Sequence, residues 1–176
     1  MARTKTRPSP KDDFSVSAMR VVILTVSDSV SAGNAEDRSG PAVNARCSEL
    51  GWTIVSAAVL PDDHRSIEDF LKRTAYPGDV DLILTTGGTG VSRRDVTPEA
   101  TIAACERLIP GFGEQMRAEG LKKNPRATLS RAAAGIRGTT LIINLPGSPR
   151  GSVESLDAIA HLLPHAVDVL HGARHE

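Results

Sequence analysis

The run Val80–Gly90, with the sequence VDLILTTGGTG, decides the fold, because a strand passes directly into a glycine-rich loop. A second strand is predicted at Arg20–Val26 (RVVILTV), a near-continuous apolar run of the kind found in strands that are buried on both faces. Outward from these two segments, short β-rich runs alternate with helical stretches. This alternation predicts an α/β fold of three layers, in which helices cover both faces of a mostly parallel sheet.

Two further strands are predicted at Trp52–Leu60 and Thr139–Asn144. Capping residues, early prolines and apolar stripes mark the helices, with Ser39 and Thr97 as expected caps. Residues 124–137 are ambiguous, and Ala127–Ala134 is the candidate helix within them. The predicted helices are Ser39–Leu50, Ser66–Ala75, a helix that begins at Thr97 and is broken by Pro110, Phe112–Ala118, and Ser152–His171 with a kink near Pro164.

The length of 176 residues suits one domain with a single core. We expect this domain to span residues 20–173. Residues 1–19 are basic and polar and lack the apolar segment of a secretory signal, so we interpret them as a disordered tail.

Composition argues against nucleic acids and membranes as the main partners. Basic and acidic residues number 21 each, so the formal net charge is zero, whereas duplex-binding proteins usually carry a basic excess. No apolar run is long enough to span a bilayer.

Cys47 and Cys105 lack a CxxC partner and are interpreted as free thiols, which fits a cytoplasmic protein.

Loops of unusual composition follow four of the predicted strands at once. In a parallel sheet such loops gather along one edge, at the carboxyl ends of the strands, where these folds bind ligands. Residues far apart in the sequence are therefore expected to share one cleft. The loops are Ser27–Ser29, Pro61–Asp63, Gly87–Gly90 and Pro146–Pro149.

The segment Thr85–Gly90 is the best candidate for binding phosphate. Glycines let main-chain N–H groups approach phosphate oxygens, and the threonines add hydroxyl donors. The segment matches neither GxxxxGK[ST] nor GxGxxG, and a plain tight turn is the alternative. Its position after a buried strand, with Arg93-Arg94-Asp95 following, favours the anion site.

Asp62 and Asp95 each follow shortly after a strand end, so both can face the cleft. Mg²⁺ prefers one or two carboxylates together with substrate phosphates and water. Two alternatives remain: Asp62 or Asp63 could cap the next helix, and Asp95 could pair with a neighbouring arginine. His161 and His165 are four residues apart but lack a third ligand, so we interpret them as surface or packing residues.

Several motifs, taken in order, resemble those of the MogA/MoaB family of molybdenum cofactor biosynthesis proteins. The resemblance extends over residues 20–172. The segments that carry it are Ser27-Asp28 with Gly33, Asp37, Ser39 and Gly40, then Leu60–Asp63, Thr85–Gly90, Arg94–Ala100, Pro110–Glu114, Leu129–Arg131 and Asn144–Pro149.

The resemblance implies a molybdopterin-binding (MoaB/Mog) fold that assembles as a homotrimer. It also implies a nucleotidyltransferase, molybdopterin adenylyltransferase, which transfers AMP from ATP to molybdopterin in an Mg²⁺-dependent reaction that releases pyrophosphate. Asp62 and Asp95 would be the catalytic carboxylates that handle Mg²⁺. The implied binding residues are Ser27, Asp28, Thr86, Gly87, Gly88, Thr89, Gly90, Thr97, Glu114, Ser130, Asn144, Pro146, Gly147 and Ser148.

One alternative belongs to another class of protein. Related domains act as molybdopterin carriers, or as scaffold parts of gephyrin-like proteins, with little or no adenylation, and a shared fold does not guarantee turnover. The presence of both Asp62 and Asp95 favours the enzyme. Insertion of molybdate belongs to a larger multidomain relative.

Overall fold

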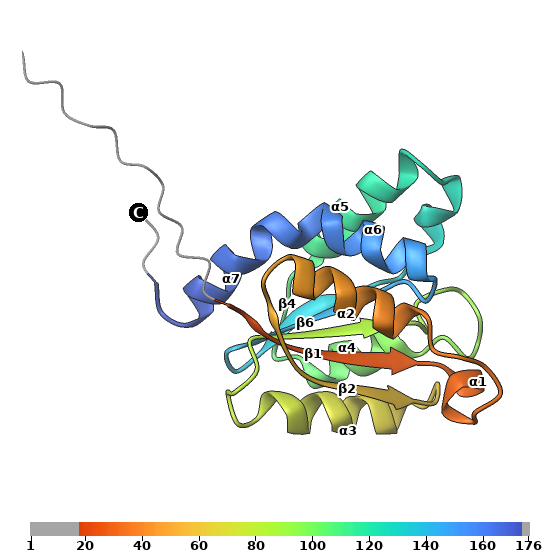
Figure 1. Ribbon diagram of the computed structural model, residues 1–176, viewed down its shortest axis with the longest axis horizontal. Coiled ribbons are helices and arrows are strands. Elements are labelled where there is room, and N and C mark those ends of the chain that lie inside the picture. Colours follow the sequence, from red (N-terminus) through yellow and green to blue (C-terminus); the bar gives the residue numbers. More distant parts are fainter. Residues whose placement is uncertain (1–17, 174–176) are drawn as a thin grey trace, which may run out of the picture.

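The computed structural model describes residues 18–173 (Figure 1). The expected tail, residues 1–19, lies outside this range except for Ala18 and Met19. Met19 is 2% exposed and belongs to the core, so it packs with the domain that was predicted to begin at residue 20.

The described residues form a six-stranded sheet with the strand order β2-β1-β3-β6-β5-β4. β1, β2, β3 and β6 are parallel, whereas β5 is antiparallel to β6 and β4 is antiparallel to β5. The prediction of a mostly parallel sheet is therefore confirmed. The strands are β1 (Arg20–Val26), β2 (Thr53–Leu60), β3 (Leu82–Thr86), β4 (Arg107–Leu108), β5 (Ala134–Arg137) and β6 (Thr140–Leu145).

Helices cover both faces of this sheet, which confirms the three layers (Figure 1). α3 (His64–Ala75) and α4 (Thr97–Ala104) lie on one face. The other face carries α2 (Ser39–Glu49), α5 (Pro110–Leu121), α6 (Pro149–Ile159) and α7 (Leu163–Leu170). Short elements complete the fold: α1 (Asp28–Ser31), η1 (Pro125–Leu129) and η2 (Ala160–Leu162).

The central strands are apolar on both faces because each face packs against helices. In β1, Ile23 belongs to the core beneath α2, α5, α6 and α7, while Leu24 belongs to the core beneath α3 and α4. Leu84 and Ile83 divide in the same way on β3. This two-sided burial explains why these strands show no alternation of polar and apolar residues.

The two expected helix caps are wrong. At α2 the carboxylate of Asp37 accepts a hydrogen bond from the main-chain N–H of Gly40 at 2.9 Å, so Asp37 performs the role expected of Ser39. At α4, Thr97 is the first helical residue and makes no side-chain cap. This helix ends at Ala104 rather than near Pro110, because Arg107–Leu108 leaves the helical layer to join the sheet as β4.

Three other helix predictions change. The helix predicted at Phe112–Ala118 is longer, Pro110–Leu121. Ala127–Ala134 is not helical, because the chain forms a short 3-10 helix and then pairs with β6. The last predicted helix starts at Pro149 and is interrupted by η2, so that Pro164 lies in the first turn of α7, where its missing N–H costs little.

The strand order changes direction at β1, because β2 lies on one side of it and β3 on the other. The carboxyl ends are level: Val26 pairs with Leu60, and Thr86 pairs with Thr25 and Leu145. Their loops therefore meet at one edge, where α1 lies in Figure 1. This switch point is where doubly wound α/β sheets place their ligands.

No described helix is long and apolar enough to cross a membrane. Both cysteines are free. Burial raises the pKa of Cys47 to about 12 and that of Cys105 to about 11, so both remain thiols at neutral pH and neither is an activated nucleophile.

Candidate active site

Two cavities lie side by side at the carboxyl edge of the sheet. The smaller cavity, of about 340 Å³, lies among the loops after β1, β2 and β3. The larger cavity, of about 760 Å³, lies between the glycine loop, α5, η1 and α6. Three residues line both cavities, and they are Gly88, Asp95 and Gly147.

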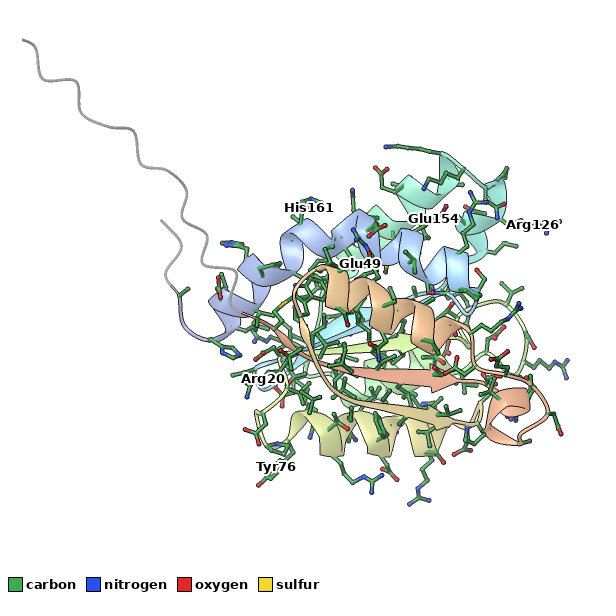
Figure 2. The ribbon with its side chains drawn as sticks, viewed as in Figure 1. Arg20, Glu49, Tyr76, Arg126, Glu154 and His161 are labelled. Carbon is green, nitrogen blue, oxygen red and sulfur yellow. The ribbon has the colours of Figure 1, made fainter. Side chains whose placement is uncertain are left out.

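Helices and the segments between them supply most of the wall of the larger cavity. Figure 2 shows Arg126, Glu154 and His161 on the α5 and α6 side of the molecule, and all three line this cavity. They come from η1, α6 and η2, respectively. Tyr76, by contrast, lies beyond the opposite face of the sheet (Figure 2).

Asp62 is available to the site because its neighbour caps the helix. Asp63 accepts from the main-chain N–H of Ser66 at 2.8 Å and is the N-cap of α3. Oδ2 of Asp62 accepts from the main-chain N–H of Asp28 at 2.9 Å, and Oδ1 of Asp28 accepts from the N–H of Asp62 at 3.0 Å. No described residue donates a hydrogen bond to Oδ1 of Asp62, so this oxygen is open to a ligand.

Asp95 has the same arrangement. Its Oδ2 accepts from the main-chain N–H of Ser92 at 2.8 Å, and no donor among the described residues reaches its Oδ1. Arg94 does not pair with it, because the Arg94 guanidinium donates two hydrogen bonds to Asp28, at 2.9 and 2.8 Å. Asp62 and Asp95 both line the smaller cavity, so the structure brings the two carboxylates together.

The charges around Asp62 suit a hard cation. Burial, followed by the negative charges of Asp28 and Asp95, raises the pKa of Asp62. The described residues hold no cluster of three or more His, Cys, Asp or Glu side chains that could bind a metal by themselves. A cation held by Asp62 and Asp95 would therefore take its remaining ligands from a substrate and from water, as Mg²⁺ usually does.

In metal-free buffer, the Asp62→Asn variant is expected to unfold at a higher temperature than the wild type at neutral pH. The raised pKa means that the charged carboxylate is less favourable in the folded chain than in the unfolded chain. This destabilisation of the wild type is complete above the raised pKa and disappears below the ordinary value of 3.8. The difference in unfolding temperature between the variant and the wild type should therefore decrease on acidification. Thermal unfolding measured across this pH range checks the result, and a less stable variant at neutral pH would contradict it.

The glycine loop is pressed against β1. Gly87 has φ +104°, and a Cβ there would collide with the carbonyl oxygen of Val26. The N–H of Gly87 donates to the carbonyl oxygen of Leu145 at 3.2 Å. The hydroxyl of Thr86 donates to the carbonyl oxygen of Pro146 at 2.7 Å. The loop after β3 is thus fastened to the loop after β6.

The next residues of this loop present unsatisfied donors. The carbonyls of Gly88 and Thr89 accept hydrogen bonds from Thr97 and Arg131. The main-chain N–H groups of Gly88, Thr89 and Gly90, by contrast, find no acceptor among residues 18–173. Successive free N–H groups of this kind form an anion-binding concavity.

Most of the predicted site residues line a cavity. Ser27, Asp62 and Gly87 line only the smaller cavity, and Gly88, Asp95 and Gly147 line both. Those that line only the larger cavity are Thr89, Gly90, Ser130, Pro146 and Ser148.

Five predicted residues line neither cavity. Asp28 lies beside the smaller cavity and is bonded to Asp62 and Arg94. Asn144 is fully buried and joins Thr85 at 3.0 Å, Thr101 at 2.7 Å and the N–H of Ala133 at 3.1 Å. The remaining three are Thr86, which is buried, Thr97, which is buried beneath Gly88 with its hydroxyl unpartnered among the described residues, and Glu114, which is exposed on α5.

Asn144, Thr86 and Thr97 are therefore buried behind the loops, and none of the three lines a cavity. The predicted site residues did not include Arg94, although the segment Arg93-Arg94-Asp95 favoured the anion site, and they did not include Arg131. Both arginines lie in the segments that carry the family resemblance. The sequence signal for Arg94 was its place between the glycine loop and Asp95. Nothing in the local sequence of α5 and α6 indicated that these helices line the larger cavity.

The described residues thus form a doubly wound α/β fold with two adjoining cavities at the carboxyl edge of its sheet, which is the edge where proteins of this class bind their ligands. The family model described as "Probable molybdopterin binding domain" matches residues 22–165. The chain belongs to this family, that of the MogA and MoaB molybdenum cofactor biosynthesis proteins.

Individual relatives agree with this membership. A Helicobacter pylori J99 protein named molybdopterin adenylyltransferase is 42% identical over 156 residues, which cover 88% of this chain and 89% of that protein. An Escherichia coli K12 protein of the same name is 39% identical over 82% of this chain and 75% of its own length. The crystal structure of the molybdopterin biosynthesis enzyme MoaB from Thermus thermophilus is 44% identical, with a TM-score of 0.83, and covers 90% of this chain and 99% of that one.

Proposed function

We propose that this protein is a molybdopterin adenylyltransferase of molybdenum cofactor biosynthesis, which transfers AMP from ATP to molybdopterin and releases pyrophosphate. The observation that carries the proposal is that two cavities meet at Gly88, Asp95 and Gly147. Two ligands held in these cavities would present their reacting groups to each other at the shared residues. Relatives that are 39–42% identical and carry this enzyme name support the assignment.

The reaction needs positioning more than covalent chemistry from the protein. An oxygen of the molybdopterin phosphate forms a bond to the α-phosphorus of ATP, the bond to the bridging oxygen of the β-phosphate breaks, and pyrophosphate leaves. The attacking phosphate is already an anion, so no strong general base is needed. Holding two ligands in line in adjoining cavities supplies the orientation on which such a transfer depends.

Specific groups of the chain would perform this positioning. The free N–H groups of Gly88, Thr89 and Gly90 can donate to phosphate oxygens at the junction. Asp62 and Asp95 would hold Mg²⁺ through their open oxygens, as their shared cavity and lack of protein donors allow. When bound, Mg²⁺ neutralises charge on the polyphosphate and orients the leaving pyrophosphate.

We also propose that the protein is cytoplasmic and acts as a homotrimer. Two free cysteines are typical of a reducing compartment. The trimer rests on the resemblance to the family, and sedimentation analysis of the purified chain tests it directly.

Incubation with molybdopterin, ATP and Mg²⁺ is expected to yield adenylyl-molybdopterin and pyrophosphate in equal amounts. Addition of EDTA should abolish both products, because without Mg²⁺ the charge of the triphosphate is not neutralised and the two carboxylates would repel it. Chromatography of the pterin product and a coupled pyrophosphate assay check this result. Tight binding of molybdopterin without product would contradict the proposal and indicate a carrier.

A further inference from the structure

Arg131 connects the wall of the larger cavity to the loop that carries Asp95. Its neighbours Ser130 and Ala132 line the larger cavity. Its side chain extends away from them: Nε donates to the carbonyl of Gly90 at 2.6 Å, and Nη2 donates to the carbonyl of Asp95, also at 2.6 Å. One guanidinium therefore joins the two ends of the segment 90–95.

Arg131 makes two further contacts. Its main-chain N–H donates to the carbonyl of Thr89 at 2.9 Å, and Nη1 forms an ion pair with Glu99 in the first turn of α4. The guanidinium is planar and presents its donors in a rigid fork, so the two carbonyls that it binds are held at a set separation.

The carbonyl contacts bear directly on the carboxylate of Asp95. This carboxylate lies against Gly90, since a Cβ added to Gly90 would come within 2.9 Å of Oδ2 of Asp95. Movement of either end of the segment would change the distance between the carboxylate and the free N–H groups of the glycine loop. Arg131 is the side chain that fixes both ends.

We propose that Arg131 is a positioning residue, which sets the Asp95 carboxylate for a divalent cation at the junction of the two cavities. The inference rests on the proposed function, because it assigns a role towards the proposed metal site. The ion pair with Glu99 does not account for the two hydrogen bonds that Arg131 donates to the carbonyls of Gly90 and Asp95. The ion pair is half exposed, with Arg131 at 37% and Glu99 at 48%, and such pairs contribute little to stability.

Binding of Mn²⁺ in the presence of ATP, followed by electron paramagnetic resonance, tests the role without relying on turnover. Arg131→Gln should weaken Mn²⁺ binding by about 10–100-fold, as changes to residues that orient metal ligands usually do. Arg131→Lys should weaken it similarly, because an ammonium keeps the charge beside Glu99 but cannot reproduce the fork. Thermal unfolding of each variant verifies that it is folded under the conditions of the measurement.

Two matched variants serve as controls. Glu99→Gln removes the ion pair and leaves the carbonyl contacts, and Arg73→Gln removes a positive charge from α3 at a residue that lines neither cavity. Both should bind Mn²⁺ as the wild type does. Wild-type affinity in Arg131→Gln, or recovery in Arg131→Lys, would overturn the positioning role alone, whereas a wild type that binds no Mn²⁺ would overturn the metal site and this inference with it.

Discussion

Replacement of Asp95 by alanine is expected to lower the rate of adenylyl transfer by about two to three orders of magnitude, the loss typical of removing one electrostatic contact in a transition state. Asp95 lines both cavities and has one oxygen without a protein donor among the described residues. In the proposed reaction it would stand where charge shifts from the α-phosphorus to the departing pyrophosphate. The effect should fall mainly on kcat, because the larger cavity retains its other lining residues.

A second substitution separates charge from local structure. Asp95→Asn keeps an oxygen that can accept from the N–H of Ser92, so the turn at residues 92–95 should persist. Its activity should nevertheless fall close to that of Asp95→Ala. Asp79→Asn serves as the matched control, because Asp79 is 83% exposed and pairs with Arg20 away from both cavities. Undiminished turnover in purified Asp95→Ala would refute the catalytic role.

Gly87→Ala is expected to abolish most of the activity and to reduce the free energy of unfolding. The position has φ +104°, which costs about 1–3 kcal/mol for a residue with a side chain. The new Cβ would also collide with the carbonyl oxygen of Val26 in the adjacent strand. Because backbone forms the obstacle, the loop must move, and the N–H groups of Gly88 to Gly90 would move with it.

Gly51→Ala separates strain from collision. Gly51 has φ +79° at the end of α2, and no atom lies within 4 Å of a Cβ placed there. This variant should lose about 1 kcal/mol of stability and keep full activity. Urea unfolding and the adenylation assay on both variants check the prediction. Equal losses of stability in the two variants would show that the contact with Val26 is unimportant.

The sequence predicted which loops form the candidate site, but it did not predict which side chains contact one another there. It placed the loops after β1, β2, β3 and β6 at one edge, because the direction of parallel strands follows from their composition and connections. It could not separate Asp62 from Asp63 as the helix cap, since both have the same local chemistry. The structure separates them, because Asp63 reaches Ser66 while Asp62 reaches Asp28, which is distant in the sequence.

The sequence by itself determined the layers of this protein and the edge of the sheet at which the candidate site lies, because apolar runs, prolines and glycines act over a few residues and carry their signal locally. Only the tertiary structure decided that Thr97 lies beneath Gly88, that Arg94 pairs with Asp28, and that α5 and α6 line the larger cavity. The formation of strands by residues 107–108 and 134–137 was decided in the same way. Each of these outcomes depends on which distant segment comes within hydrogen-bonding or packing distance, and that distance exists only after the chain has folded.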